Sequence, residues 1–212
     1  MRTLVIDTAT AACSVALIDD GAVVARMHEI VGRGHAERLV PMIATLPGGG
    51  RADRIAVDCG PGSFTGVRVG LAAARGLALG WDVPVHGFSS LALIAVAGLR
   101  ARRCDRIVAV VEGGHGEVFM QGFTVASATT AVAAIDVLVS HKPDAAIAAL
   151  GGLPACGNGA ARLRAADAGI DAIDALPDAA DWPLLPPALA ELPPRPIYGR
   201  EPDARVPGAS AG

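Results

Sequence analysis

The chain has 212 residues, which is enough for one large domain or two small lobes with a sizeable core. Apolar residues make up 52% of it, which excludes disorder along the whole chain, and aromatic residues only 3%, so Val, Leu, Ile and Ala must build the core. The formal net charge is -3, whereas a protein that binds nucleic acid by itself normally carries a basic excess. Any nucleic acid that the chain serves is therefore expected to be held by a partner.

The distribution of lysine and cysteine excludes several chemistries. Lys142 is the only lysine, so a Walker-type phosphate loop, which needs a lysine directly after its glycines, is excluded, and a lysine nucleophile is nearly so. The cysteines lie far apart and include no C-x-x-C pair, which argues against a zinc module and a disulfide scaffold. They are Cys13, Cys59, Cys104 and Cys156.

The first residues run directly into an apolar strand, without the charged region, apolar segment and cleavage site of a secretory leader. No apolar run approaches the roughly 20 residues that a membrane-spanning helix needs. We therefore expect a soluble, cytoplasmic protein with reduced thiols and no membrane partner.

The N-terminal half opens with three short apolar runs joined by two short turns, a pattern typical of an antiparallel β-meander. The runs are residues 4–6, 13–18 and 22–27. A helix is expected over residues 35–46, where apolar residues recur at helical spacing, although Pro41 lies inside it.

An alternation of strands and helices follows the meander and predicts an α/β lobe with a mixed sheet. The expected elements are a strand at residues 54–57, a helix at 67–79, a strand at 83–85 and a helix at 91–99 with Ser89 as its N-cap.

The pattern restarts beyond about Arg103, so we expect an N-terminal lobe over residues 1–103 and a smaller C-terminal lobe with a tail over residues 104–212. Elements expected in the second part are strands at 107–111 and 117–125 around a turn at Gly113-Gly114, helical stretches near 145–150 and 160–168, a proline-rich loop or extended connection at 183–196, and a frayed end at 207–212.

The most informative stretch is GPGSFTGVRVGLAAARGLALG, residues 60–80. Gly60 and Gly62 permit unusual dihedral angles where a strand ends, and Gly66 leads into a helix whose N–H groups could face an anion. The glycine spacing is not the dinucleotide fingerprint. A phosphate cradle and a tight structural turn both stay open, with the turn favoured.

The helix that follows is apolar over much of its surface and rich in alanine and glycine. Val67, Leu71 and Ala74 form one stripe, and neighbouring apolar residues widen it. Such a helix is either enclosed in the fold or docked to another chain, and the residues alone leave both readings open.

Asp7, Thr8 and Thr10 follow the first predicted strand. A carboxylate and two hydroxyls at a tight turn could position a metal-bound phosphate, but an Asx-type turn explains them slightly better.

The remaining polar residues form no recognisable catalytic set. No two histidines are three or four residues apart, so no helix presents a pair of metal ligands, and no metal site is expected. His35 is interpreted as a surface or capping residue. Ser63 lies in G-P-G-S-F, which is not a nucleophile elbow, and Glu112 and Glu117 flank a turn and are interpreted as solvated.

Several of these segments together resemble the bacterial tRNA threonylcarbamoyladenosine biosynthesis family TsaB. The resemblance is carried by IDTATAACSVAL (6–17), HAERLVPMI (35–43) and above all GPGSFTGVRVGLAAARGLA (60–78), with weaker likeness in GEVF (116–119), the turn 157–159 and PIYGREPDAR (196–205). It is strong over the first lobe and thin over the second.

The resemblance implies an α/β, actin-like ATPase fold of the ribonuclease H-like class, with two related lobes whose mixed sheets are flanked by helices. It also implies a non-catalytic subunit, not itself an enzyme, that pairs with the paralogue TsaD. TsaD transfers threonylcarbamoyl to an adenosine of tRNAs that read codons starting with A, using a metal site with an H-x-x-x-H pair that this sequence lacks.

The small-residue helix resembles the surface through which the family docks to TsaD. The residues expected at this interface are Phe64, Val67, Arg68, Leu71, Ala72, Ala74, Arg75 and Ala78. The resemblance further implies that the ATPase TsaE joins at the interface of the pair, that tRNA is served indirectly, and that the subunit pairs with itself when TsaD is missing. Asp7, Thr8 and Thr10 would be a vestigial phosphate site, with no required cofactor and weak nucleotide binding left open.

Two departures from the family pattern concern mainly the second lobe. Glu112-Gly113-Gly114 stands where the family usually has Asp-Ala-Arg, and the connection at residues 47–51 looks short. The alternative function is an active small-molecule kinase or ATPase of the same fold that uses Asp7 at the phosphate. No nucleophile–base arrangement supports a peptidase.

Overall fold

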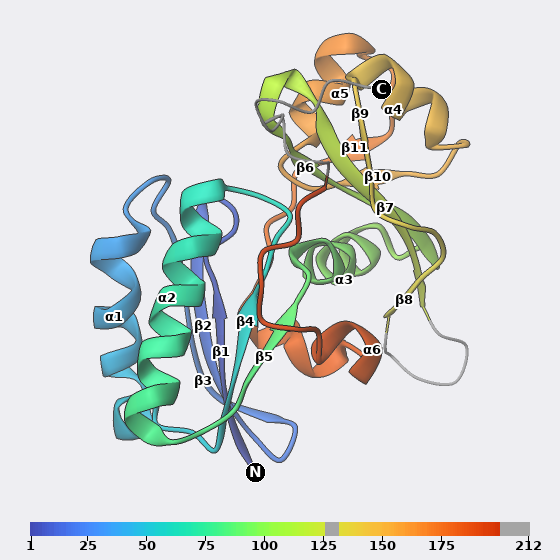
Figure 1. Ribbon diagram of the computed structural model, residues 1–212. Helices are drawn as coiled ribbons and strands as arrows, with labels where there is room; N and C mark the ends of the chain where they lie inside the picture. Colours follow the sequence, from blue (N-terminus) through green and yellow to red (C-terminus); the bar gives the residue numbers. More distant parts are fainter. Residues whose placement is uncertain (126–131, 200–212) are drawn as a thin grey trace, which may run out of the picture.

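The computed structural model describes residues 1–125 and 132–199 (Figure 1). Its first sheet has the strand order β3-β2-β1-β4-β5. The predicted meander is confirmed, because β1, β2 and β3 pair antiparallel, while β4 and β5 continue the sheet parallel to β1. The strands are β1 (Arg2–Asp7), β2 (Ala12–Asp19), β3 (Ala22–Ile30), β4 (Arg54–Asp58) and β5 (Val85–Phe88).

The second sheet repeats this plan in the order β11-β10-β6-β7-β8, since a meander of β6, β7 and β8 is extended by β10 and β11, which run parallel to β6. A further strand, β9, pairs with β7. The strands are β6 (Arg106–Glu112), β7 (Val118–Val125), β8 (Val132–Ala134), β9 (Val139–His141), β10 (Ala155–Cys156) and β11 (Ala172–Ile173). Only β6 and β7 were predicted from the sequence.

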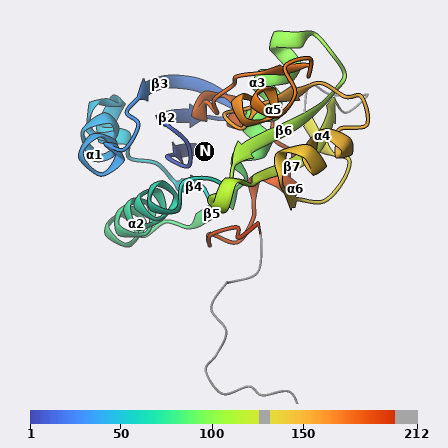
Figure 2. The ribbon, with the colours of Figure 1, turned by 90° about the horizontal axis from the view of Figure 1, so that it is seen from above.

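The helices form layers on both sides of each sheet (Figures 1 and 2). Helices α1 and α2 cover the outer face of the first sheet, α3 lies between the two sheets, and α4 and α5 cover the outer face of the second. The α-helices are α1 (His35–Thr45), α2 (Phe64–Trp81), α3 (Ser90–Arg102), α4 (Pro143–Ala149), α5 (Ala160–Ala166) and α6 (Pro187–Ala190); the 3-10 turns are η1 (Pro47–Gly50), η2 (Gly114–Gly116) and η3 (Ala179–Leu184).

Side chains that point alternately to the two faces of each strand explain these layers. In β1, Leu4 and Ile6 face α1 and α2, whereas Val5 faces the central core built around α3. In β6, Ile107, Ala109 and Val111 face the same central core, whereas Val108 and Val110 face α4 and α5. Because successive side chains of a strand point to opposite faces, a run that is apolar at every position is a strand covered on both faces.

Several predicted boundaries needed correction. Helix α2 begins at Phe64 because the Ser63 hydroxyl accepts a hydrogen bond from the Gly66 N–H at 3.2 Å. The strand predicted at 83–85 instead begins at Val85. Ser89 is the N-cap residue of α3, but its side chain makes no capping hydrogen bond. The β6–β7 turn is centred on η2, where His115 and Gly116 have positive φ angles of 57° and 73°.

The chain returns to the first sheet after β11. Arg26 of β3 pairs with Asp178 at 3.2 Å, and η3 packs on the inner face of this sheet. Residues 192–198, which we call the strap, then run along the edge strand β5, where Gly87 and Leu192 exchange two backbone hydrogen bonds of 2.7 and 2.8 Å. The proline-rich connection predicted at 183–196 is thus partly helical, as α6, and partly extended.

Two remaining expectations concern the ends and the membrane. The tail at 207–212 and part of the segment at 196–205 lie outside the described residues. Among the residues that the structure describes, none of the helices is long and apolar enough to cross a bilayer.

Candidate functional site

Helix α2 approaches the end of β1 closely because three glycines leave room for backbone. A Cβ atom at Gly62 would lie 2.2 Å from the Ala9 carbonyl oxygen, and one at Gly66 would lie 2.0 Å from the Thr8 carbonyl oxygen. One at Gly70 would lie 2.5 Å from Thr8 Oγ1. These contacts explain the glycine-rich motif as a packing requirement, in agreement with the structural turn that the sequence favoured.

The inner face of α2 belongs to the core of the chain itself. Val67, Leu71, Ala74 and Ala78 are 5%, 3%, 0% and 8% exposed and pack with β1 and β4. The prediction that these four side chains meet a partner is therefore wrong for the folded chain, because the first sheet already covers them. The apolar stripe read from the sequence was the core-facing stripe.

The outer face of α2 carries the other four residues predicted at the interface. Phe64, Arg68, Ala72 and Arg75 are exposed, and Leu79 beside them is 87% exposed. Gly76 and Gly80 complete this face, and a Cβ atom added at either would meet nothing within 4 Å. We call this set the outward face of α2: Phe64, Arg68, Ala72, Arg75, Gly76, Leu79 and Gly80. We did not predict Leu79 at the interface from the sequence, because apolar residues cover more of the helix surface than the face that packs on the sheet.

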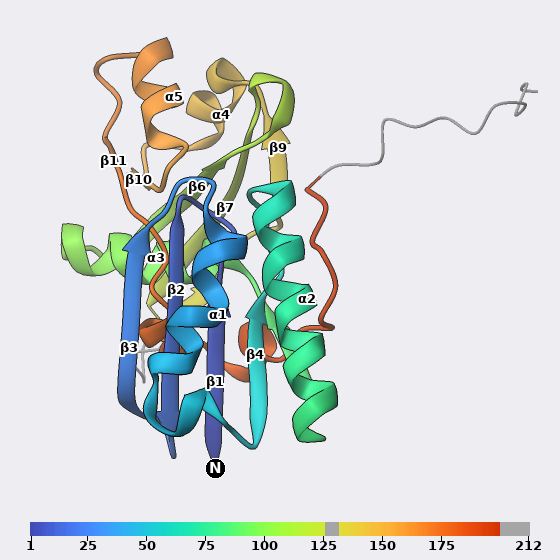
Figure 3. The ribbon, with the colours of Figure 1, turned by 90° about the vertical axis from the view of Figure 1, so that its left-hand side faces the viewer.

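The two arginines of the outward face contact the strap. Arg68 Nη2 donates to the Tyr198 hydroxyl at 3.2 Å, and Arg75 Nη2 donates to the Pro194 carbonyl oxygen at 2.8 Å. The Arg68 guanidinium also lies over the Phe64 ring, 3.2 Å from its centroid. Figure 3 shows the strap running beside α2 at one edge of the outer layer.

Asp7, Thr8 and Thr10 lie together at the end of β1, but they are buried and bonded within the chain. Thr8 Oγ1 donates to the Gly66 carbonyl oxygen at 2.7 Å, and Thr10 Oγ1 accepts from the Ala12 N–H at 3.2 Å. Asp7 Oδ1 accepts from the Ala9 N–H at 3.2 Å, which is the Asx-type turn that the sequence indicated.

A second buried carboxylate, which sequence reasoning missed, lies next to Asp7. Strands β1 and β4 are parallel with Ile6 opposite Val57, so Asp7 and Asp58 follow at the same level. They are 0% and 1% exposed, and Asp58 Oδ1 accepts from the Gly60 N–H at 2.6 Å. The Oδ2 atoms of both residues are buried and have no partner outside this pair of carboxylates. The available signal was an aspartate at the end of each of two neighbouring strands.

Burial dominates the electrostatics of this pair. Loss of hydration raises the pKa of Asp7, hydrogen bonds from Ala9 and Asp58 oppose the rise, and the charge of Asp178 adds to it, so that the resulting pKa is about 7. Loss of hydration, followed by the charge of Asp7, raises the pKa of Asp58 well above its usual range. Asp58 therefore favours its protonated form, in which it can donate a hydrogen bond to Asp7, since two charged carboxylates cannot share so dry a site.

Other polar residues singled out in the sequence have structural contacts. His35 is buried, and its Nε2 atom lies 3.1 Å from the Ala12 carbonyl oxygen, so its interpretation as a surface or capping residue is wrong. Ser63 caps α2, and Glu112 pairs with Arg162 at 3.0 Å. Within residues 1–125 and 132–199, no group of three or more His, Cys, Asp and Glu side chains could hold a metal ion.

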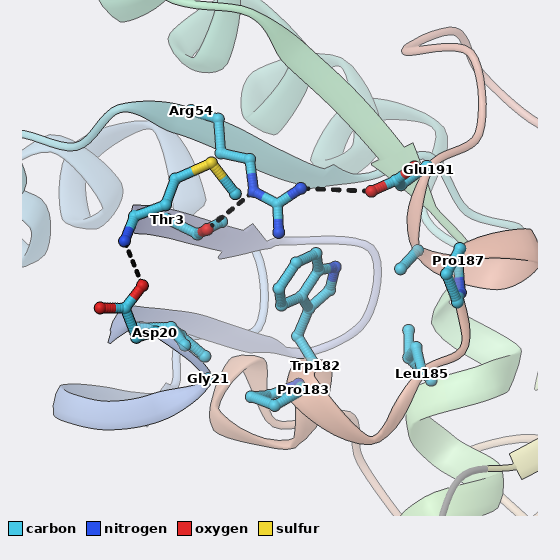
Figure 4. Close-up of a pocket in the computed structure, with 12 residues that line it drawn as sticks. Thr3, Asp20, Gly21, Arg54, Trp182, Pro183, Leu185, Pro187 and Glu191 are labelled. Carbon is cyan, nitrogen blue, oxygen red and sulfur yellow. Dashed lines mark hydrogen bonds and ion pairs between the residues drawn. The ribbon is translucent and has the colours of Figure 1, made fainter.

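A cavity of about 360 Å³ lies at the opposite end of β1, between the first sheet and the returning C-terminal segment (Figure 4). Arg54 donates to Thr3 Oγ1 at 2.9 Å, pairs with Glu191 at 3.2 Å and lies over the Trp182 ring, 5.0 Å from its centroid. The N-terminal amine pairs with Asp20. The charged groups lining this cavity are thus paired with one another, and the Arg54–Glu191 pair fastens the C-terminal segment to the first sheet.

A family model described as "TsaD: tRNA N6-adenosine threonylcarbamoyltransferase" matches residues 26–143, which is more than half of the chain. The chain belongs to this family. Its relatives include the tRNA threonylcarbamoyladenosine biosynthesis protein TsaB of Escherichia coli, with 45% identity over 124 residues that cover 56% of this chain and 53% of the relative. TsaB of Haemophilus influenzae is 40% identical over 121 residues, covering 55% and 51%. The chain thus spans about half the length of these curated relatives.

Three further matches extend over nearly the whole chain. An uncharacterized protein of Mycobacterium tuberculosis is 33% identical over 218 residues, covering 95% of this chain and 93% of the relative. The solved structure of YeaZ from Pseudomonas aeruginosa matches with a TM-score of 0.75 and 28% identity over 93% of this chain and 99% of that one. Another Pseudomonas aeruginosa structure, described as similar to peptidase YeaZ, has a TM-score of 0.77 and 29% identity over 94% and 99%. The predicted resemblance and the predicted α/β fold with two mixed sheets flanked by helices are confirmed.

Proposed function

We propose that the chain is a non-catalytic subunit that pairs with TsaD through the outward face of α2. In this proposal TsaD transfers threonylcarbamoyl to an adenosine of tRNAs that read codons starting with A. TsaE joins at the interface of the pair, and this subunit serves tRNA indirectly, through its partner. The setting is the cytoplasm, and the chain consists of two lobes that meet near Arg103. The family membership and the names of the TsaB relatives support the pathway.

The observation that carries the docking surface is the exposure of apolar side chains on α2. Phe64 is 68% exposed and Leu79 is 87% exposed, at opposite ends of one helix. Between them lie Ala72 and Gly76, whose small size leaves the middle of the face flat. Apolar ends around a flat centre allow another helix to approach closely and bury both large side chains.

The non-catalytic part of the proposal rests on burial. Asp7, Thr8 and Thr10 are 0%, 1% and 3% exposed, and their side chains bond to the chain's own backbone. An active kinase or ATPase of this fold would need them to reach a phosphate. ATP turnover by the isolated chain that is lost on Asp7→Ala would favour this alternative over a pseudoenzyme.

Copurification with TsaD tests the docking surface. Ala72→Glu and Leu79→Glu place charge on the outward face without disturbing the core, so both variants should fold and lose the complex. Val137→Glu is the matched control, because Val137 is an exposed apolar residue beside the second sheet. If Ala72→Glu and Leu79→Glu both retain TsaD and support tRNA modification as the control does, the proposed surface is wrong.

A further inference from the structure

Two arginines on the outward face of α2 lie seven residues apart on a helix without any acidic residue. Arg68 and Arg75 are both exposed, and α2 has the sequence FTGVRVGLAAARGLALGW. Seven residues are about two helical turns, so both guanidinium groups lie along the same face, about 10 Å apart along the axis. They stand on either side of the small residue Ala72.

Within residues 1–125 and 132–199, the contacts of these two arginines include no carboxylate that would compensate their charges. Arg68 donates to the Phe64 carbonyl oxygen at 3.1 Å and to the Tyr198 hydroxyl at 3.2 Å, and Arg75 donates to the Pro194 carbonyl oxygen at 2.8 Å. All of these acceptors are neutral. By contrast, Arg38 on the neighbouring helix α1 pairs with the Glu29 carboxylate at 2.7 Å.

The strap holds the two guanidinium groups in place. Its backbone is fixed to the first sheet, since the Ile197 N–H donates to the Cys59 carbonyl oxygen at 2.8 Å and Leu192 pairs with Gly87. The acceptors on Pro194 and Tyr198 are therefore anchored beside α2 (Figure 3). A side chain ordered before binding loses less conformational entropy when it meets a charged partner group.

We propose that the partner surface covering α2 carries carboxylates opposite Arg68 and Arg75, around an apolar centre that meets Ala72 and Gly76. This inference rests on the proposed docking through α2. A partner that covers the face removes water from both cations, and burying an unpaired cation is costly. Opposite charges at these two points would offset that cost and fix the register of the two helices.

The same charges disfavour two other occupants. A second copy of this chain, packed helix to helix, would bring two faces together that each carry Arg68 and Arg75 and no helix carboxylate. A nucleic acid would find few cations here, with exposed apolar residues such as Leu79 in their place. An acidic protein surface satisfies both the charges and the apolar ends.

Titration calorimetry of the full chain with TsaD encoded by the same genome tests the proposal. Binding should weaken as sodium chloride rises from 50 to 300 mM, because salt screens the paired charges. Arg68→Glu and Arg75→Glu should each raise Kd about tenfold or more at low salt. Arg75→Lys should bind nearly as the unaltered chain does, whereas Arg75→Met, which keeps an apolar stem, should bind less tightly. Arg106→Glu, an exposed arginine at the start of β6, is the control and should leave Kd unchanged.

The outcomes separate this inference from the proposed function. Binding that is insensitive to salt and to both reversals, or equally tight with Arg75→Met, overturns the acidic partner and leaves docking through α2 standing. No complex with TsaD under any condition overturns both. Reversals that alter only self-association, or only affinity for tRNA, also overturn the inference and point to a second copy or a nucleic acid. Circular dichroism of each variant checks that the overall helical content is unchanged.

Discussion

Replacing Asp58 by asparagine should stabilise the chain above neutral pH and reduce the dependence of its stability on pH. In the unaltered chain, Asp7 and Asp58 are buried side by side, each with an Oδ2 atom that has no partner outside the pair. Asparagine keeps an oxygen that can accept the Gly60 N–H, and its amide can donate to Asp7 without needing a proton from solvent. The variant therefore replaces the proton shared by Asp7 and Asp58 with an amide N–H that donates to Asp7 at every pH.

The direction in which stability changes with pH follows from the raised pKa values of the two carboxylates. An acid whose pKa is higher in the folded state contributes stability that is fully present below the pKa of the unfolded state and is lost as pH rises through the folded value. For Asp7 this window runs from 3.8 to about 7, and the difference corresponds to roughly 4 kcal/mol. Asp58, whose pKa is also raised, adds to the loss of stability as pH rises. The nearby thiols of Cys13 and Cys59 stay neutral there, since burial raises their pKa values to about 11 and about 12.

Urea unfolding at pH 5, 6, 7 and 8 and constant ionic strength measures the effect. The unaltered chain should lose stability steadily over this range, whereas Asp58→Asn should show a smaller slope and exceed it by about 1–3 kcal/mol at pH 8. Asp82→Asn, an exposed residue at the end of α2, is the charge-matched control. An unchanged slope in Asp58→Asn would refute the shared proton, even if the variant were less stable overall.

Three further predictions concern the packing of α2 and of the C-terminal segment. Gly66→Ala should destabilise the chain by about 3 kcal/mol or more, because the added Cβ atom would lie 2.0 Å from the Thr8 carbonyl oxygen. Gly76→Ala, whose Cβ atom would meet nothing within 4 Å, should stabilise the chain by up to about 1 kcal/mol. Thermal denaturation compares the two variants directly, and equal effects would contradict the close approach of α2 to β1. Ser63→Ala removes the N-cap of α2 and should lower the free energy of unfolding, measured with urea, by about 1 kcal/mol. Ser63→Thr should retain most of the stability that the cap contributes. An unchanged free energy of unfolding in Ser63→Ala would show that the cap does not stabilise the helix. Arg54→Ala removes contacts to Thr3, Glu191 and Trp182, so it should lower the free energy of unfolding by about 1–2 kcal/mol and speed proteolysis of the C-terminal segment. The control Arg106→Ala should do neither. Equal proteolysis rates in the two variants would argue against this fastening.

Sequence alone determined most of the regular elements. Hydrophobic runs predicted β1, β2 and β3, and helical spacing predicted α1 and α2, because burial of a repeating apolar face stabilises long elements whatever their neighbours are. Strands β10 and β11 have two residues each, and β8 and β9 have three, so no period could be read from them. Strands β8 and β9 are ordered by pairing with β7, β10 by pairing with β6, and β11 by pairing with β10, and only the tertiary structure supplies these neighbours.

The candidate site divides in the same way. The sequence marked α2 as an unusually apolar, small-residue helix, and it placed Asp7, Thr8 and Thr10 at a turn. It could not say which side of α2 the first sheet covers, so Leu71 and Ala74 were predicted at an interface although they form the core, while Leu79 was missed. Asp58 becomes a partner of Asp7 only because β4 lies parallel to β1, and the strap reaches Arg75 only because the chain returns after β11. Periodicity is a local property of one helix or strand, whereas the choice between core and surface depends on contacts between residues far apart in the chain.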